Sequence, residues 1–185
     1  GAGGEGPALT RPADDDSVAQ LVQDGRVVES VPERLGEPIA AAPEGEGPLT
    51  WQFAADKVRT FAWTSSDATI YDACSVQWDD GKTTLVQSVY PREAKSAWNE
   101  SSQMLRYSIM NYSQQWFRYP YPVATNVNGV CGGMEYPMII FCSGRSGDER
   151  GLYGVTTHEI GHNWFPMLVN TDERRSAWID EGFNT

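Results

Sequence analysis

The sequence predicts an α+β fold, in which a mixed sheet is combined with helices. Three observations support this prediction. Residues 69–91, TIYDACSVQWDDGKTTLVQSVYP, contain two apolar runs around Asp80-Gly81, a dipeptide typical of a hairpin turn. Residues 94–118 have apolar side chains at helical spacing. Residues 132–141, GGMEYPMIIF, favour a strand, and a segment with helical spacing follows them.

The helical spacing within residues 94–118 is carried by one row of side chains: Trp98, Leu105, Ile109, Tyr112 and Trp116. These positions fall on one face of a helix. The YPYP run at 119–122 should end it, because proline cannot continue a helix. We expect a second helix to begin near Gly151 or Leu152 and a third near Ser176.

The first 50 residues are rich in glycine, proline, alanine and acidic residues, and AAPEGEGP at 41–48 resembles a linker. Two short apolar pairs, Leu21-Val22 and Val27-Val28, are candidates for edge strands. Between Val58 and Trp63 the alternating pattern favours a half-buried strand.

The charge balance excludes two classes of partner. Lys and Arg total 14 against 25 Asp and Glu, so the net charge is −11. A nucleic-acid backbone or an anionic membrane surface would repel this chain. No apolar run is long enough for a membrane span, and the N-terminus does not resemble a signal peptide. A leader removed from a longer precursor stays open, and the sequence does not indicate the compartment.

The three cysteines, Cys74, Cys131 and Cys142, include no CxxC pair, so a cysteine-based metal site is not expected. If the segment from Cys131 to Cys142 is extended, its ends lie roughly 35 Å apart. That separation is too long for a disulfide. We therefore expect each cysteine to be a free, buried thiol, and the redox compartment stays undecided.

Both histidines of the chain, His158 and His162, lie four residues apart in HEIGH. On a helix this spacing puts both imidazoles on one face, where they can bind one ion. A catalytic zinc takes three protein ligands and water, and Glu181 is the natural third ligand. Glu159 is then placed to exchange a proton with that water. A helix with two histidines and no metal is the alternative.

Two blocks of the sequence resemble the aminopeptidase N type of gluzincin zinc metallopeptidases. HEIGH, eighteen residues and the glutamate of WIDEGFNT resemble the HExxH-x18-E signature, and GGMEY resembles the G-x-M-E-N strand. The resemblance extends from about residue 50 to 185. It implies zinc ligands His158, His162 and Glu181, the general base Glu159, an α-amine-binding Glu135, and substrate-lining backbone at Gly132, Gly133 and Met134.

The resemblance implies a thermolysin-like gluzincin catalytic subdomain, preceded by the end of a β-rich domain. We expect residues 1–66 to be a linker and the tail of that domain. Residues 67–185 are then the N-terminal part of the catalytic domain, with the remainder expected C-terminal to this chain. In this family an oxyanion-stabilising tyrosine lies further downstream, and no residue here matches it.

The implied function is zinc-dependent hydrolysis of peptide bonds, with removal of N-terminal residues from a peptide or protein substrate. The final asparagine of the G-x-M-E-N pattern is Tyr136 here. If Tyr136 alters the amine site, a zinc endopeptidase is the alternative. A catalytically silent, zinc-containing interaction module is the other.

Overall fold

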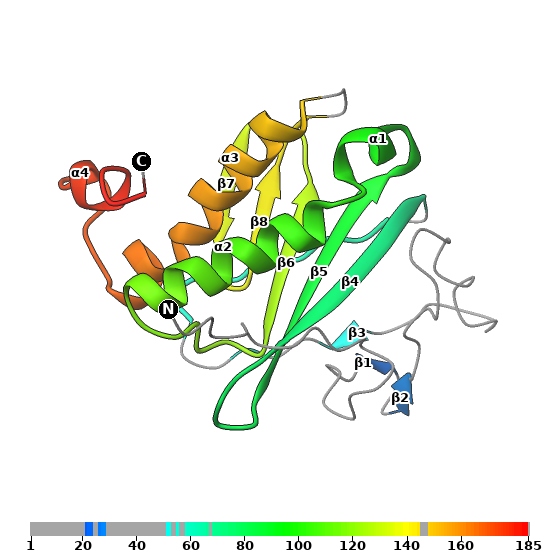
Figure 1. Cartoon of the computed structure of the whole chain (residues 1–185), viewed down its shortest axis with the longest axis horizontal. Coiled ribbons are helices and arrows are strands. Elements are labelled where there is room, and N and C mark those ends of the chain that lie inside the picture. Colours follow the sequence, from blue (N-terminus) through cyan, green and yellow to red (C-terminus); the bar gives the residue numbers. More distant parts are fainter. Residues whose placement is uncertain are drawn as a thin grey trace, which may run out of the picture.

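The structure is a computed structural model of the 185-residue chain. It describes residues 21–23, 26–28, 51–52, 55, 58–66, 68–144 and 148–184. Within these ranges the chain forms a small three-stranded sheet, a larger five-stranded sheet and a group of helices (Figure 1).

The five-stranded sheet has the strand order β4-β5-β6-β8-β7. Its strands are β4 (Thr69–Gln77), β5 (Thr83–Pro91), β6 (Val123–Asn128), β7 (Gly133–Tyr136) and β8 (Ile139–Cys142). The β5–β6 and β6–β8 pairs are parallel, whereas β4–β5 and β7–β8 are antiparallel. The mixed sheet and the α+β class predicted from the sequence are therefore confirmed. Strand β7 lies at the edge of this sheet.

The β4–β5 hairpin follows the sequence prediction. Its register runs from Thr69 opposite Pro91 to Gln77 opposite Thr83. Gly81 has a φ of 79° in the connecting turn, a backbone conformation that glycine adopts readily. The sequence signal identified the position of this turn correctly.

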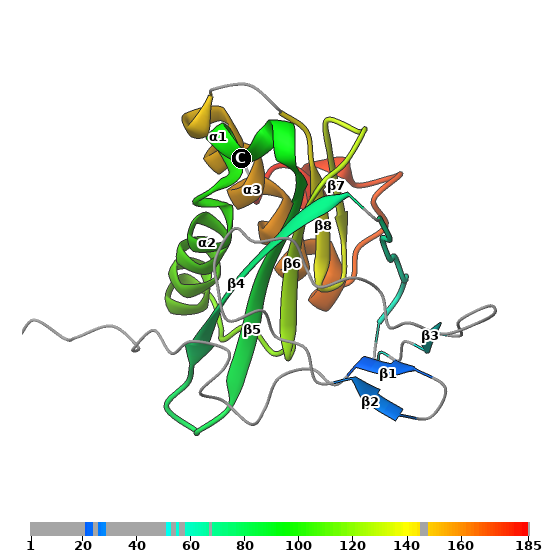
Figure 2. The same cartoon turned by 90° about the vertical axis from the view of Figure 1, so that its right-hand side faces the viewer.

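Helices α1, α2 and α3 lie on one face of the five-stranded sheet, with α2 and α3 side by side (Figures 1 and 2). The helical segments are η2 (Arg92–Ala94), α1 (Lys95–Trp98), α2 (Ser101–Gln115), α3 (Glu149–Gly161), η3 (Asn163–Leu168) and α4 (Ala177–Asp180). The region 94–118, predicted as one helix, is divided after Trp98. There the Ser101 hydroxyl donates a hydrogen bond of 2.6 Å to the Trp98 carbonyl.

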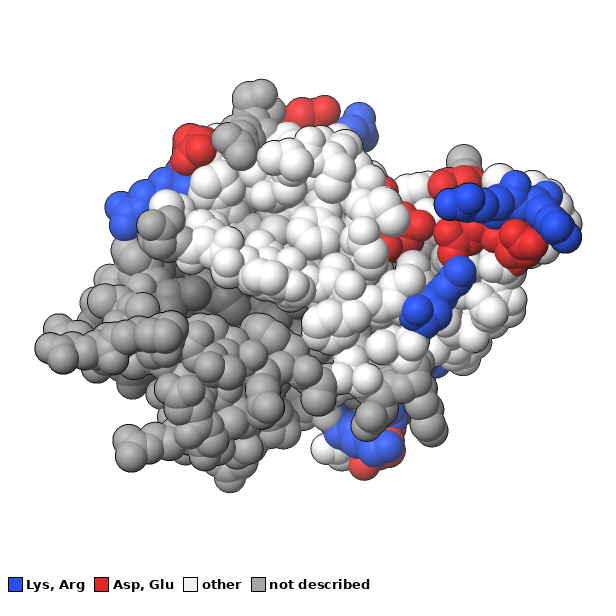
Figure 3. All heavy atoms as spheres, turned by 180° about the vertical axis from the view of Figure 1, so that it is seen from behind, with Lys and Arg blue, Asp and Glu red and all other residues white. Residues whose placement is uncertain are grey.

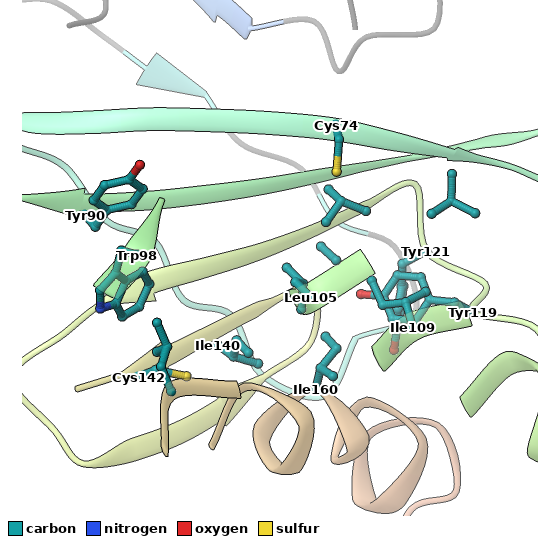
Figure 4. Close-up of a cluster of buried hydrophobic side chains, with 14 of the residues drawn as sticks. Cys74, Tyr90, Trp98, Leu105, Ile109, Tyr119, Tyr121, Ile140, Cys142 and Ile160 are labelled. Atoms are coloured by element: carbon teal, nitrogen blue, oxygen red, sulfur yellow. The ribbon is translucent and has the colours of Figure 1, made fainter. Parts of the chain in front are cut away.

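The hydrophobic core lies between the helices and the sheet (Figure 4). Leu105 and Ile109 of α2, Ile140 of β8 and Ile160 of α3 are completely buried. Burial of these apolar side chains is the main favourable contribution to folding, at about 25 cal/mol per Å² of apolar surface. On a helix, Ile160 points away from the face that His158 and His162 share. Its burial in the core therefore fixes the direction of the histidine-bearing face of α3.

Residues 132–141, predicted as one strand, form the antiparallel β7–β8 hairpin instead. The chain reverses at Pro137 and Met138, and Met138 has a φ of 67°. The extended-strand prediction was wrong because a turn without glycine or asparagine gives little sequence signal. The distance argument for Cys131 and Cys142 fails with it. All three cysteines are free, but Cys131 is exposed, not buried as expected.

The N-terminal part contains strands β1 (Leu21–Gln23), β2 (Arg26–Val28) and β3 (Trp51–Gln52), paired in the order β2-β1-β3. Both predicted strands are therefore present, but only β2 lies at an edge, since β1 pairs with both β2 and β3. The half-buried strand predicted for Val58 to Trp63 is not formed, and Phe61 and Trp63 are exposed. The predicted linker at 41–48 lies outside the described residues. The division into domains at residues 66 and 67 stays a prediction.

Charged side chains gather at the end of the molecule that carries α4 (Figure 3). Arg59 forms an ion pair of 2.7 Å with Glu173 at this end. None of the helices in the described part of the chain has the length and apolarity to cross a membrane.

Candidate metal centre

Helix α3 presents the two histidines. Its first turn is capped by Asp148, whose side chain accepts a hydrogen bond of 2.9 Å from the Gly151 amide. The helix begins at Glu149, two or three residues earlier than predicted, and ends at Gly161, so that His162 caps it. The two Nε2 atoms are 3.3 Å apart. His162 is fully buried and the His158 side chain is 30% exposed.

Glu181 reaches the histidines from the end of the short helix α4. The chain leaves α3 through η3 and turns at Asp172, whose carbonyl accepts a hydrogen bond of 2.8 Å from Ser176. Glu181 then caps α4. Its Oε2 atom lies 3.1 Å from His158 Nε2 and 3.7 Å from His162 Nε2. The structure therefore brings together all three residues predicted as ligands.

The triangle of these three atoms fits a tetrahedral zinc ion. Zn–N and Zn–O bonds of about 2.0–2.1 Å place neighbouring ligand atoms of a tetrahedron about 3.3 Å apart. The three sides of the triangle measure 3.1, 3.3 and 3.7 Å. Nitrogen and carboxylate oxygen are also the atoms that catalytic zinc sites use.

Hydrogen bonds on the far side of each ring orient both imidazoles. His158 Nδ1 lies 2.9 Å from the Asn184 carbonyl oxygen, which can only accept. The two Nδ2 hydrogens of Asn184 point to the carbonyls of Phe165 and Asp180, at 2.9 and 2.8 Å. His162 Nδ1 therefore carries a hydrogen, which it donates to the Phe165 carbonyl 3.0 Å away. The Asp180 carboxylate lies beside the same nitrogen, with 2.8 Å between Oδ1 and Nδ1.

With hydrogen on both Nδ1 atoms, both Nε2 atoms face each other and Glu181 as bare lone pairs. Such an arrangement is repulsive unless a cation lies between the three atoms. Partners behind metal-binding histidines are a common feature of metal sites, since they fix the tautomer and the ring orientation. The chemistry of the three atoms thus fits a divalent cation.

Glu159, expected as the general base, faces Glu135 of strand β7. Ligand atoms of Glu135, Glu159 and His162 all lie within 4.8 Å of one another. Glu159 is only 5% exposed, and its Oε2 has no hydrogen-bond partner among the described residues. Burial, followed by the negative charge of Glu135, raises the pKa of Glu159 from 4.5 to about 8. The two carboxylates form a site that favours positive charge or a shared proton.

Strand β7 carries the remaining predicted residues. Gly133, Met134 and Glu135 lie in the strand, and Gly132 directly precedes it. A Cβ atom at Gly133 would overlap Glu159 Oε1, so glycine is required for the close approach of β7 to α3. Gly132 has open space around its Cα and faces no such restriction.

Tyr136 does not disturb strand β7. It pairs regularly with Ile139, and its ring makes an edge-on contact with Phe141 at 5.9 Å between centroids. Side chains alternate along a strand, so the Tyr136 ring and the Glu135 carboxylate point to opposite faces. The bend that this departure from the G-x-M-E-N pattern could have caused is absent from β7.

Sequence reasoning did not identify Asn184, which contacts both histidines. The only available signal was that DEGFN continues the motif around Glu181. Polar residues in so short a segment follow no period that would reveal their partners.

No protein-family model matches this chain. Rat and human aminopeptidase B are each 43% identical to it over 54 residues, which are 28% of this chain and 8% of each relative. The 54 matched residues of the chain resemble aminopeptidase B. The relatives therefore support the resemblance to aminopeptidase N type metallopeptidases that the motifs indicate, although the match spans less than a tenth of their length.

Among solved structures, an M1 zinc metallopeptidase mutant from Deinococcus radiodurans is similar, with a TM-score of 0.47 and 20% identity. This similarity covers 63% of the present chain and 27% of that protein.

Proposed function

We propose that this chain forms the metal centre of a zinc-dependent aminopeptidase, with His158, His162 and Glu181 as the zinc ligands. The observation that carries the proposal is the triangle of three lone-pair atoms, with sides of 3.1 to 3.7 Å. The similarity to aminopeptidase B supports a peptide or protein substrate with a free N-terminus.

In this proposal Glu135 binds the α-ammonium group of the substrate. Its carboxylate lies close to Glu159, and the two negative charges together attract an ammonium group. Among the described strands β7 is the last of its sheet, so an extended peptide can pair with the backbone at Gly132, Gly133 and Met134. The ammonium–Glu135 pair then sets how far the peptide enters, and only the first peptide bond reaches the metal centre.

When bound, zinc lowers the pKa of a coordinated water molecule and polarises the scissile carbonyl group. Glu159 accepts the proton of the attacking water and transfers it to the leaving amine. Its pKa of about 8 without metal reflects an apolar, negatively charged setting. The carbonyls of Asn184 and Phe165, with the Asp180 carboxylate beside His162, hold the two imidazole rings in the orientation that exposes Nε2.

Residues 67–185 are proposed as the N-terminal part of a catalytic domain that continues beyond this chain, and residues 1–66 as a linker and the tail of a β-rich domain. The two alternatives, an endopeptidase and a silent zinc-containing module, differ from this proposal in their substrates and turnover. Regular pairing at Tyr136 favours the aminopeptidase, since the strand under Glu135 is undistorted.

The test begins with bound zinc, measured by elemental analysis of the purified protein. Turnover is then measured with an amino-acyl reporter and its N-acetylated counterpart, on this chain and on any longer natural product of the gene. Cleavage of the free-amine reporter alone supports the aminopeptidase. Cleavage of both identifies an endopeptidase, and zinc without any turnover identifies a silent module.

Glu159→Gln is the first variant to examine, because it removes the proposed base without removing a proposed ligand. We expect zinc content to remain at the wild-type level, whereas turnover falls by about 10²-fold or more. His158→Ala removes a proposed ligand and serves as the contrast, since it should lower both zinc content and turnover. Turnover that survives in Glu159→Gln would show that another group accepts the proton.

A further inference from the structure

Asn163 lies directly after the proposed ligand His162 and contacts the turn of the β7–β8 hairpin. Its side chain is completely buried. Its Oδ1 accepts a hydrogen bond of 2.9 Å from the Met138 amide, and its Nδ2 donates one of 3.3 Å to the Tyr136 carbonyl. One side chain therefore binds the backbone on both sides of Pro137.

The turn that Asn163 binds is an unfavourable one for its sequence. Pro137 followed by a residue with positive φ is the pattern of a type II turn, whose third position is normally glycine or asparagine. Met138 occupies this position with a φ of 67°. A non-glycine residue rarely adopts this conformation unless the surroundings stabilise it. The two hydrogen bonds from Asn163 are such a stabilising contact.

A third bond connects Asn163 to the body of the sheet. The Tyr119 hydroxyl lies 3.3 Å from Asn163 Oδ1 and 3.1 Å from the Val123 carbonyl at the start of β6. The Met138 carbonyl also accepts a bond of 2.8 Å from Thr125 of β6. The side-chain amide of Asn163 is thus itself held in place, so it can fix the position of the β7–β8 turn relative to β6.

The path from the metal centre to the amine site is consequently very short. His162 is joined to Asn163 by a peptide bond, Asn163 is hydrogen-bonded to Tyr136, and Tyr136 is joined to Glu135 by a peptide bond. We propose that Asn163 is a positioning residue that sets the distance between the Glu135 carboxylate and the metal centre. This inference rests on the proposed function, since it concerns the amine site of that same centre.

Asn163 therefore acts on selectivity for a free amine, not on metal binding or proton transfer. It contacts neither the proposed zinc ligands' Nε2 atoms nor the Glu159 carboxylate. Loss of its amide should let the β7 turn relax, and Glu135 should then bind an ammonium group at the wrong distance. Zinc affinity should change little, because the Asn184 and Phe165 carbonyls orient the histidine rings without the side chain of Asn163.

The experiment compares the binding of leucine hydroxamate and N-acetyl-leucine hydroxamate to the zinc-loaded chain by calorimetry. The wild type should prefer the free amine. In Asn163→Ala this preference should fall about tenfold, the size expected for a misplaced charge-assisted hydrogen bond. Zinc affinity should stay within about threefold, because the orienting bonds of both histidines remain. Slow hydrogen exchange of the Met138 amide should also be lost.

Asn126→Ala is the matched control. Asn126 is equally buried, but its side chain donates a hydrogen bond of 2.9 Å to Thr156 of α3 instead of to the turn at Pro137 and Met138. It should lower stability as much as Asn163→Ala and leave the amine preference unchanged. Should Asn163→Ala fail to fold, Asn163→Ser gives the same comparison with a smaller change.

Met138→Gly provides a rescue, because glycine adopts positive φ without strain and needs less support from Asn163. Added to Asn163→Ala, it should restore part of the amine preference. A preference that Asn163→Ala retains in full, or loses to the same degree as Asn126→Ala, overturns the positioning role alone. A wild-type chain that binds both hydroxamates equally contradicts the aminopeptidase proposal itself, and the inference with it.

Discussion

Gly161, at the end of helix α3, lies against the side chain of Asn184. A Cβ atom there would overlap Asn184 Oδ1 and lie 3.2 Å from the Tyr112 hydroxyl. The absent side chain thus makes room for Asn184, whose carbonyl and amide contact both histidines. The sequence predicted a metal site on this helix, but it did not predict that Asn184 lies against this glycine.

We predict that Gly161→Ala weakens zinc binding by about 10- to 100-fold, because displacing an orienting partner of a ligand typically has this effect. Gly154→Ala is the matched control on the same helix, since a Cβ atom there meets nothing within 4 Å. It should leave zinc affinity unchanged and stabilise the helix by about 0.5–1 kcal/mol. Competition with a chromogenic chelator measures the affinities. Equal zinc affinity in both variants would contradict the role of Asn184.

Glu159 makes the free energy of unfolding of the metal-free chain depend on pH. Its pKa is about 8 in the folded chain and near 4.5 when unperturbed. Between these values the folded state holds a proton that the unfolded state has lost, so stability falls as pH rises from about 4.5 to 8. Glu159→Gln should remove this part of the dependence. Urea unfolding of chelator-treated wild type and variant at pH 5, 6.5 and 8 is the measurement. If the free energy of unfolding changed with pH in the same way in both proteins, the pKa of Glu159 would not be raised.

At the scale of elements, the site depends on how closely β7 approaches α3. Gly133 permits this approach, because any side chain there would collide with Glu159 and lie 3.2 Å from Val155 Cγ2. We predict that Gly133→Ala destabilises the fold by about 1–3 kcal/mol, the usual effect of overpacking. Gly132→Ala, next to it but in open space, should change the free energy of unfolding by less than about 0.5 kcal/mol. Urea unfolding compares the two, and similar losses would show that the contact is not decisive.

The same elements show where sequence reasoning succeeded. The β4–β5 hairpin was predictable because Asp80-Gly81 is a strong local turn signal and both strands are long. The β7–β8 hairpin was not, because its turn is built on Pro137 and Met138 and is stabilised by Asn163, which is 25 residues away. Pro137 is a local turn signal, but Met138 replaces the glycine or asparagine that would complete the turn pattern.

At the scale of the whole molecule, residues placed by local spacing could be predicted from the sequence, whereas residues placed by tertiary packing could not. His158 and His162 are related by one helical turn, so their spacing alone predicted their convergence. Glu181 could be placed through the family resemblance, since eighteen residues separate it from His162. The orienting partners Asp180 and Asn184 depend on how α4 packs against the end of α3. That packing is a tertiary property, and the motif alone does not specify it.

The proposed zinc ligands come from two segments that polar contacts of Asp180 and Asn184 join. Helix α4 has four residues and its Trp178 is 70% exposed, so little apolar burial holds it in place. Binding of a metal to both α3 and Glu181 should therefore couple α4 to the rest of the fold. Because an ion that binds only the folded state stabilises it, zinc at about 100 times its Kd should add about 2.7 kcal/mol.

We therefore predict that zinc raises the Tm of the wild type by roughly 5–10 °C and slows hydrogen exchange in α4, and that a chelator reverses both effects. Glu181→Gln removes the ligand that connects α4 to the histidines. Since its side chain is 57% exposed, the metal-free Tm should stay near that of the wild type, while most of the zinc-induced rise disappears. Glu149→Gln, an exposed carboxylate in the first turn of α3, should retain the full rise. A zinc-induced rise that persists in Glu181→Gln, with α4 still protected, would mean that the ion binds without connecting the two segments.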